Sequence, residues 1–169
     1  MTLADFDRLA PDAARDALLA CCADPRWADA LVAARPFETL DALLRAAEDE
    51  WAHADETERL AAFAAHPRIG DVAHLRERFA GTARTEQGQV LGADEDVLQR
   101  LKLLNDAYFE RFGFIFIICA SGRSAAEMLA AIEARIDNPR ATELDNAARE
   151  QGRILALRLR RLFDEDSSP

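Results

Sequence analysis

The sequence predicts an all-α protein, a single compact multi-helix domain with one buried extended segment. Three observations lead to this prediction. Apolar residues recur at helical spacing along most of the chain, and Pro, Gly, Asp and Thr divide these periods into about eight helices. One continuous apolar stretch, FIFIICA at 114–120, has no second strand with which to pair. The length of 169 residues fits one domain better than two.

We therefore expect one domain over 1–163 and an acidic, disordered tail over 164–169. In the first half of the chain the helices begin at Pro11, after Asp24 and at Thr39, and Cys21 and Cys22 fall on the first of them. The predicted spans are 11–23, 25–34, 39–54 and 56–65. The last of these stops at His66 because a residue that precedes a proline is pushed out of the helical region.

The second half of the chain shows equally clear starts and stops. Asp71 caps a helix over 72–79, and three glycines make 81–92 a loop and a candidate active-site segment. Asp94 starts a long helix that Gly113 stops. Ser124 and Glu127 form a capping box for a helix over 125–136, and Thr142 starts the last helix.

Charge and composition exclude several classes of function. The net charge of −10 argues against a nucleic-acid partner, and no apolar run reaches the roughly 20 residues that a membrane span needs. The acidic N-terminus does not resemble a signal peptide, and three cysteines without disulfide or zinc spacing fit a reducing cytoplasm. The single lysine, Lys102, lies at the edge of an apolar helix face, which argues against Schiff-base chemistry.

His66 has three interpretations. It can be a helix-stop residue with a satisfied hydrogen bond, a general acid or base, or a metal ligand together with His74 or Asp71. The metal interpretation lacks suitable spacing, and His53 belongs to a different helix. The negative carbonyl end of a helix favours a protonated imidazole, which suits a proton donor.

Arg158 stands out among the five arginines of the last helix. At about 100° per residue, it alone falls on the apolar face, beside Gln151. An inward guanidinium is costly unless an acidic side chain or an anionic ligand pairs with it. A structural ion pair and an anion site are therefore both open.

Two other polar segments are ambiguous from the residues alone. Glu86 and Gln87 are most simply solvated loop residues. The turn of Ser121, Gly122 and Arg123 is either a plain helix cap or an anion-binding concavity.

Several motifs together resemble one protein family. They are AHPRIGD at 65–71, TEQ at 85–87, an N-x-x-Y-x-x-x-F-G pattern at 105–113, FIFIICASGRSAAEM at 114–128 and ILALRL at 154–159. This set resembles the 2-oxo-4-hydroxy-4-carboxy-5-ureidoimidazoline (OHCU) decarboxylases, which act last in the oxidation of urate to (S)-allantoin. The match extends from Phe6 to Phe163.

The resemblance implies a cofactor-free, metal-free, all-helical homodimer that decarboxylates a small anionic ureidoimidazoline. It implies catalytic roles for His66, Glu86 and Arg158. The residues implied to contact the substrate are Pro67, Ala83, Arg84, Thr85 and Gln87, and, through the backbone, Phe116, Ile117, Ile118, Cys119 and Ala120.

One position departs from the family pattern. Family members commonly have a serine where this chain has Ala83, which removes a hydrogen bond worth about 0.5 to 1.5 kcal/mol. This departure leaves open an alternative function, that of a lyase that acts on a related ureide or hydroxy-acid anion. From another class, a helical interaction module would make the inward Arg158 and the helix caps purely structural.

Overall fold

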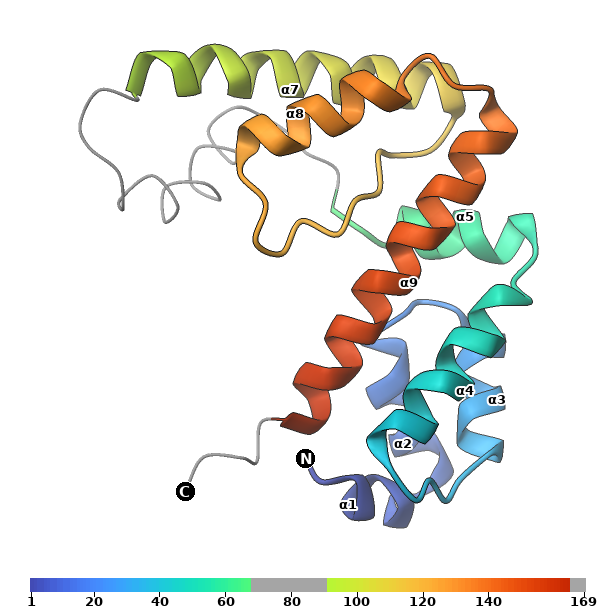
Figure 1. Ribbon diagram of the computed structural model, residues 1–169. Coiled ribbons are helices and arrows are strands. Elements are labelled where there is room, and N and C mark those ends of the chain that lie inside the picture. Colours follow the sequence, from blue (N-terminus) through green and yellow to red (C-terminus); the bar gives the residue numbers. More distant parts are fainter. Residues whose placement is uncertain (68–90, 165–169) are drawn as a thin grey trace. The chain divides into compact units, whose positions relative to one another are not determined.

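The computed structural model describes residues 1–67 and 91–164, and within these ranges every regular element is a helix (Figure 1). This confirms the predicted all-α class. None of the described helices has both the length and the apolar character needed to cross a membrane. The predicted cap Asp71, the helix over 72–79, most of the predicted loop and residues 165–169 lie outside the described residues. The helices are α1 (Leu3–Arg8), α2 (Pro11–Leu19), α3 (Pro25–Ala33), α4 (Leu40–Ala52), α5 (Glu56–Ala64), α7 (Leu91–Phe112), α8 (Ala125–Arg135) and α9 (Arg140–Asp164).

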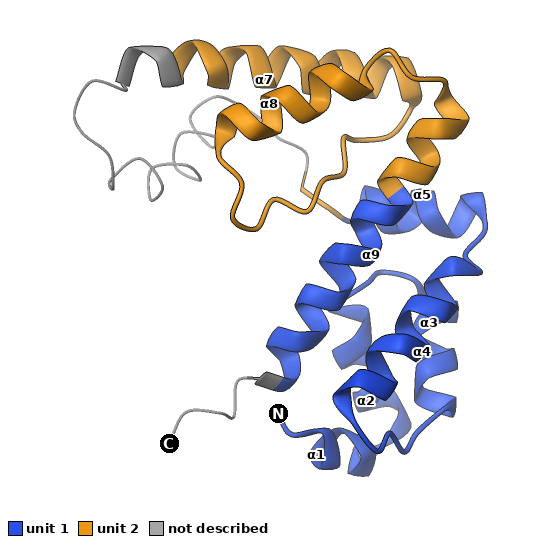
Figure 2. Cartoon of the chain, viewed as in Figure 1, with its two compact units in different colours: residues 1–65, 148–169 blue, residues 66–147 orange. Residues whose placement is uncertain are grey.

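The chain divides into two compact units (Figure 2). Unit 1 comprises Met1–Ala65 and Ala148–Pro169, and unit 2 comprises His66–Ala147. The boundary between Ala147 and Ala148 falls within α9. The first turns of this helix therefore belong to unit 2, and the remainder belongs to unit 1. The organisation as one domain over 1–163 stays a prediction.

Side-chain caps define most of the helix starts. Asp24 and Thr39 accept hydrogen bonds from backbone N–H groups in the first turns of α3 and α4, as predicted from the sequence. The predicted capping box of Ser124 and Glu127 is also confirmed at the start of α8. At the end of α7, Gly113 adopts a φ of +79°, a left-handed conformation that favours glycine, and this confirms the predicted stop.

Several boundaries differ from the prediction. Helix α1 was not predicted, and α7 begins at Leu91 rather than at Asp94, so the last two residues of the predicted loop are helical. Helix α9 begins at Arg140, before the predicted start at Thr142.

The prediction that placed Cys21 and Cys22 on a helix is wrong. Helix α2 ends at Leu19, and the backbone N–H groups of both cysteines donate to the Leu18 carbonyl in a closing turn, at 2.9 and 3.0 Å. The physical reason lies downstream, because Pro25 disfavours a helical Asp24 and the chain must leave α2 in time for Asp24 to cap α3.

The core of unit 1 forms where α3 packs against α2 and α4. Its two tryptophans join apolar packing to specific backbone contacts. The indole N–H of Trp27 donates to the Ala47 carbonyl at 2.9 Å, and that of Trp51 donates to the Ala148 carbonyl at 2.8 Å. The second contact ties α4 to α9. Other fully buried side chains of this core are Phe6, Leu18, Leu31, Leu43 and Phe63.

The core of unit 2 forms between α7 and α8 and includes the connection between them. Residues 115–120 of this connection are in neither a helix nor a strand, and Phe116 and Ile117 are buried. The ring of Phe116 meets that of Tyr108 edge to face, with centroids 5.2 Å apart. The predicted buried extended segment is indeed outside the helices, and it is buried at Phe116 and Ile117 but partly exposed from Ile118 to Ala120.

A buried carboxylate lies within unit 2. Glu143, in the first turn of α9, has no exposed surface and accepts hydrogen bonds from Tyr108, Asn138, Asn146 and Arg135 at 2.5 to 2.9 Å. Burial alone raises the pKa of this carboxyl, but the hydrogen bonds and the Arg135 charge outweigh burial and lower the pKa. Glu143 is therefore charged and fully partnered in the folded protein.

Replacement of Glu143 by Gln should remove a pH-dependent part of the stability. Because folding lowers the pKa of Glu143 below its ordinary value of 4.5, this contribution is present above the ordinary value and is lost as the pH falls through the lower folded value. We expect the wild type to exceed Glu143→Gln in unfolding free energy by about 3 kcal/mol near neutral pH. Urea unfolding at several pH values should show this gap narrowing below about pH 4.5. A gap that stays constant down to about pH 3 contradicts the account.

Candidate active site

His66 lies directly after the end of α5. The helix ends at Ala64, Ala65 forms its C-cap, and the partly exposed His66 precedes Pro67, so the predicted helix break is confirmed. The backbone N–H of Ala65 still donates to the Ala61 carbonyl, at 3.3 Å. His66 therefore follows the carbonyl end of a helix, where a hydrogen-bond donor is favoured. Pro67 is exposed.

Arg158 is the only one of the five predicted α9 arginines that is not exposed. One terminal nitrogen of its guanidinium donates to the Cys21 carbonyl at 2.9 Å. Within the described part of the chain, no carboxylate forms an ion pair with Arg158. A carbonyl satisfies one N–H but does not neutralise the charge, so the remaining donors suit an anionic ligand.

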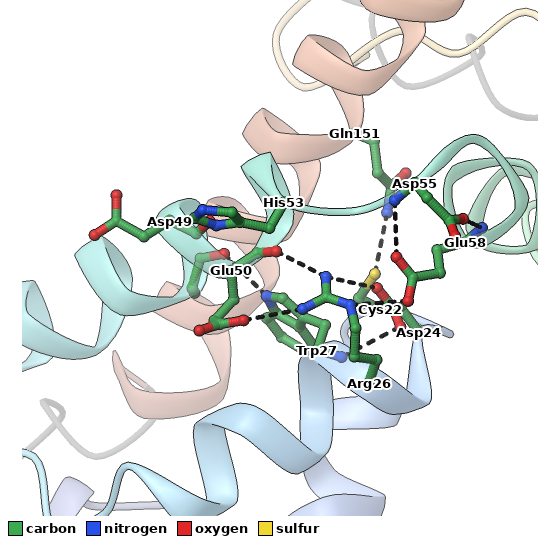
Figure 3. Close-up of polar contacts among 11 residues, drawn as sticks. Cys22, Asp24, Arg26, Trp27, Asp49, Glu50, His53, Asp55, Glu58 and Gln151 are labelled. Carbon is green, nitrogen blue, oxygen red and sulfur yellow. Dashed lines mark hydrogen bonds and ion pairs between the residues drawn. The ribbon is translucent and has the colours of Figure 1, made fainter.

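The turn that supplies the Cys21 carbonyl is fixed by its surroundings in unit 1. On α9, two helical turns before Arg158, the buried Gln151 directs its amide nitrogen toward the Cys22 sulfur at 3.9 Å (Figure 3). Asp24 follows the turn, is buried, and accepts from the backbone N–H of Trp27 at 3.2 Å. The placement of Arg158 therefore depends on the fixed geometry of this turn.

Arg26 links this turn to two other helices (Figure 3). Its guanidinium contacts Glu50 at 2.9 Å and Glu58 at 2.8 Å, and it lies 3.7 Å from the Asp24 carboxylate. It also donates to the Glu50 backbone carbonyl at 2.8 Å. No sequence pattern singled out Arg26, because its acceptors come from α4 and α5, remote in the chain.

The two cysteines of the turn are poor nucleophiles. Burial raises the pKa of the Cys21 thiol. Burial, followed by the negative charge of Asp24, raises the pKa of Cys22 to about 12. These residues shape the turn and do not supply thiolate chemistry.

The predicted substrate segment, Phe116 to Ala120, is held by two arginines of unit 2. Arg135 donates to the Ile117 carbonyl at 3.0 Å, and Arg123 donates to the Cys119 carbonyl at 3.2 Å. Cys119 and its neighbours Ile118 and Ala120 are partly exposed. Carbonyls that already accept a charged donor are fixed in direction, so this segment presents a defined backbone.

The turn after this segment leads into a helix cap. Gly122 adopts a φ of +76°, and Ser124, not Ser121, caps α8. The cap of α8 is therefore made by Ser124 and Glu127, while Arg123 donates to the Cys119 carbonyl. Lys102 pairs with Asp106 at 2.8 Å on the same helix, which leaves it unsuited to Schiff-base chemistry.

The predicted site residues fall into three groups, according to the part of the chain to which they belong. His66 and the segment 116–120 belong to unit 2, and Arg158 belongs to unit 1. The predicted contacts Ala83, Arg84, Thr85 and Gln87, the predicted catalytic Glu86, and the alternative metal ligands Asp71 and His74 lie outside the described residues. The roles of all these residues stay predictions.

The described part of the chain is thus helical and contains an inward arginine, a histidine that follows a helix end, and a backbone segment whose carbonyls accept hydrogen bonds from arginines. Comparison with known proteins gives the family. A family model described as OHCU decarboxylase matches residues 7–160. The chain belongs to the OHCU decarboxylase family.

Individual relatives agree with this assignment. The chain is 35% identical over 160 residues to a uric acid degradation bifunctional protein of Arabidopsis thaliana, covering 93% of this chain but only 49% of that protein. It is 28% identical to an OHCU decarboxylase of Haloferax volcanii, and the match covers 98% of both chains.

Solved structures agree as well. A crystal structure of OHCU decarboxylase in the presence of (S)-allantoin is 35% identical, with a TM-score of 0.72 and coverage of 89% of this chain and 99% of that one. A structure of (S)-allantoin synthase, 20% identical and with a TM-score of 0.72, shares the fold.

Thiol labelling should distinguish the three cysteines of the folded protein. Cys21 and Cys22 are buried with raised pKa values, whereas Cys119 is partly exposed. We expect a maleimide at about pH 7.5 to modify Cys119 first and to reach the other two only after unfolding. Peptide mass spectrometry identifies the modified residue. Equal labelling of all three in the native protein would contradict the burial described here.

Proposed function

We propose that this chain decarboxylates OHCU to (S)-allantoin and CO2 in urate degradation, without a cofactor. The observation that carries the proposal is the full-length similarity to the OHCU decarboxylase whose structure was determined in the presence of (S)-allantoin. Membership of the family over residues 7–160 supports it. The spacing of the three cysteines, which suits neither a disulfide framework nor a zinc site, supports the cytoplasmic location that forms part of the proposal.

The substrate supplies its own electron sink. The bond between the hydroxyl-bearing ring carbon and the carboxylate breaks, CO2 leaves, and the electron pair passes into the adjacent ring imine. A proton then adds to the carbon that carries the ureido group, while the hydroxyl loses its proton and becomes the ring carbonyl. Overall, the substrate carboxylate takes up one proton and gives allantoin and CO2. The enzyme must therefore orient the carboxylate and deliver a proton to one face.

Three side chains share these tasks in the proposal. Arg158 binds an anionic or carbonyl oxygen of the substrate, supported by its lack of a carboxylate partner among the described residues. His66, beside the hydroxyl and carboxylate groups, assists CO2 loss and supplies or directs the proton. Glu86 orients the substrate through its ureido or ring N–H groups.

The remaining contacts come from the backbone and from the loop 83–87. Phe116, Ile117, Ile118, Cys119 and Ala120 provide the apolar wall, which limits access of water to the face that is not protonated. This role is supported by the burial of Phe116 and Ile117 and by the fixed direction of the segment's carbonyls.

Variant kinetics test the roles of His66 and Arg158 against matched controls. Circular dichroism on freshly prepared OHCU should show optically active allantoin forming faster than the racemic decay. His66→Ala should lower kcat/KM by about 10² to 10⁴, and Arg158→Gln by about 10² to 10³. The controls are His53→Ala, at an exposed helix end, and Arg153→Gln, an exposed α9 arginine that pairs with Glu150. These should retain wild-type rates.

A stably folded His66→Ala protein that still gives (S)-allantoin rapidly would overturn the assignment of His66. Optical activity no greater than that of the uncatalysed reaction, with wild-type protein, would favour the interaction module instead. Conversion of a related ureide in place of OHCU would favour the alternative lyase.

We also propose that the protein is a homodimer. Supporting this, the large apolar side chain of Leu103 on α7 is 62% exposed and would be covered in a dimer that packs through this helix. Light scattering coupled to size exclusion should give twice the mass of the chain. Leu103→Glu should shift the protein toward the monomer, whereas Ala130→Glu, an equal change of charge at an exposed α8 position, should not. A monomeric wild type at all concentrations contradicts the proposal.

A further inference from the structure

The guanidinium of Arg135 joins the buried carboxylate of unit 2 to the backbone of the substrate segment. Nε and one terminal nitrogen each lie 2.9 Å from the same oxygen of Glu143, and the other terminal nitrogen donates to the Ile117 carbonyl at 3.0 Å. The carbon at the centre of the guanidinium lies 4.6 Å from the centroid of the Phe116 ring. One planar group therefore contacts the carboxylate, the backbone and the ring at once.

Glu143 cannot easily turn away from this contact. Its side chain is completely buried, and its second oxygen accepts from Asn138 at 2.8 Å and from Asn146 at 2.6 Å. The hydroxyl of Tyr108 donates to the oxygen that Arg135 contacts. Because each acceptor is already engaged, rotation of the carboxylate would leave buried donors without partners, which is costly. The orientation of Arg135 is thus fixed from behind.

The geometry of the peptide bond transmits this orientation to the next residue. In a trans peptide, the carbonyl of one residue and the N–H of the following residue point in opposite directions. Since the Ile117 carbonyl points at Arg135, the Ile118 N–H points away from it. Ile118 is partly exposed, at the place where the segment leaves the core.

We propose that Arg135, oriented by Glu143, is a positioning residue that aims the Ile118 N–H at an anionic oxygen of the substrate. This inference rests on the proposed function, which assigns the segment 116–120 to the substrate. Arg135 itself touches neither the substrate nor the reacting atoms in this proposal. Its effect is to fix one backbone donor before the substrate binds, which lowers the ordering cost of binding.

A second arginine provides a matched control within the same unit. Arg140 donates to the Phe112 carbonyl at 3.2 Å, and the central carbon of its guanidinium lies 5.7 Å from the Phe114 ring centroid. It makes the same kinds of contact as Arg135, to a carbonyl and to a ring, but two to five residues earlier in the chain, at the end of α7 and the start of the connection. Those residues lie outside the segment assigned to the substrate.

The test compares Arg135→Lys with Arg140→Lys. Lysine keeps the charge but has a single point of attachment, so it cannot contact both Glu143 and the Ile117 carbonyl in the geometry of a guanidinium. We expect Arg135→Lys to raise KM and the dissociation constant of (S)-allantoin about tenfold, with a smaller change in kcat. The rate of maleimide labelling at Cys119, inside the segment, should also rise. Arg140→Lys should lower Tm without either change.

Tyr108→Phe is a milder second variant that preserves the volume of the core. It removes one donor to Glu143 and should shift KM and Cys119 labelling in the same direction, by less. Equal KM changes in Arg135→Lys and Arg140→Lys would mean that Arg135 only stabilises the fold, and this would overturn the proposal. Unchanged Cys119 labelling in Arg135→Lys would overturn it as well.

The labelling readout needs no substrate, so it separates this inference from the proposed function. If wild-type protein neither converts OHCU nor binds (S)-allantoin, the proposed function fails, and the substrate role of Arg135 fails with it. If wild-type protein is active and Arg135→Lys loosens the segment without a change in KM, only the present inference fails.

Discussion

A charged carboxylate with no exposure to water is the constraint on which unit 2 depends. Glu143 is stable in its ionised form because four side chains replace its hydration, and they come from α7, α8, the turn after α8 and α9. Any element that moved would leave a buried charge short of a donor. One side chain in the first turn of α9 therefore sets the register of the helices around it, and through Arg135 it reaches the backbone at Ile117.

Unit 1 contains the opposite case, an inward charge that is only partly compensated. Arg158 is a cation directed into the protein, and the described residues offer it the Cys21 carbonyl but no carboxylate. In the proposed function, a carboxylate partner would contribute to stability but would remove the affinity of Arg158 for an anionic substrate. The turn is stabilised by other ion pairs, in which Arg26 contacts Asp24 and also Glu50 and Glu58 of the neighbouring helices. A cation that no described carboxylate neutralises, held beside a fixed turn, is compatible with the proposed binding of a small anion.

The sequence was informative where the signal was local. Helical periodicity, the caps Asp24, Thr39 and Ser124, the stop at Gly113 and the inward direction of Arg158 all depend on neighbours within a few residues. The turn at Cys21 was missed because Ala, Leu and Cys continue a helical pattern, and only the demands of Asp24 and Pro25 end it. Glu143 was missed because an acidic residue in the first turn of a helix normally favours solvent and the helix dipole. Its partners are up to 35 residues away. The role of Glu86 came from family resemblance alone.

The central claim is that the chain converts OHCU stereospecifically, with the protonated face set by the protein. The most direct measurement is the enantiomeric composition of the allantoin formed by wild-type protein in deuterated water, followed by chiral chromatography and NMR. The account predicts (S)-allantoin with deuterium at the newly protonated carbon, formed before spontaneous decay contributes. Racemic product at the spontaneous rate would contradict it.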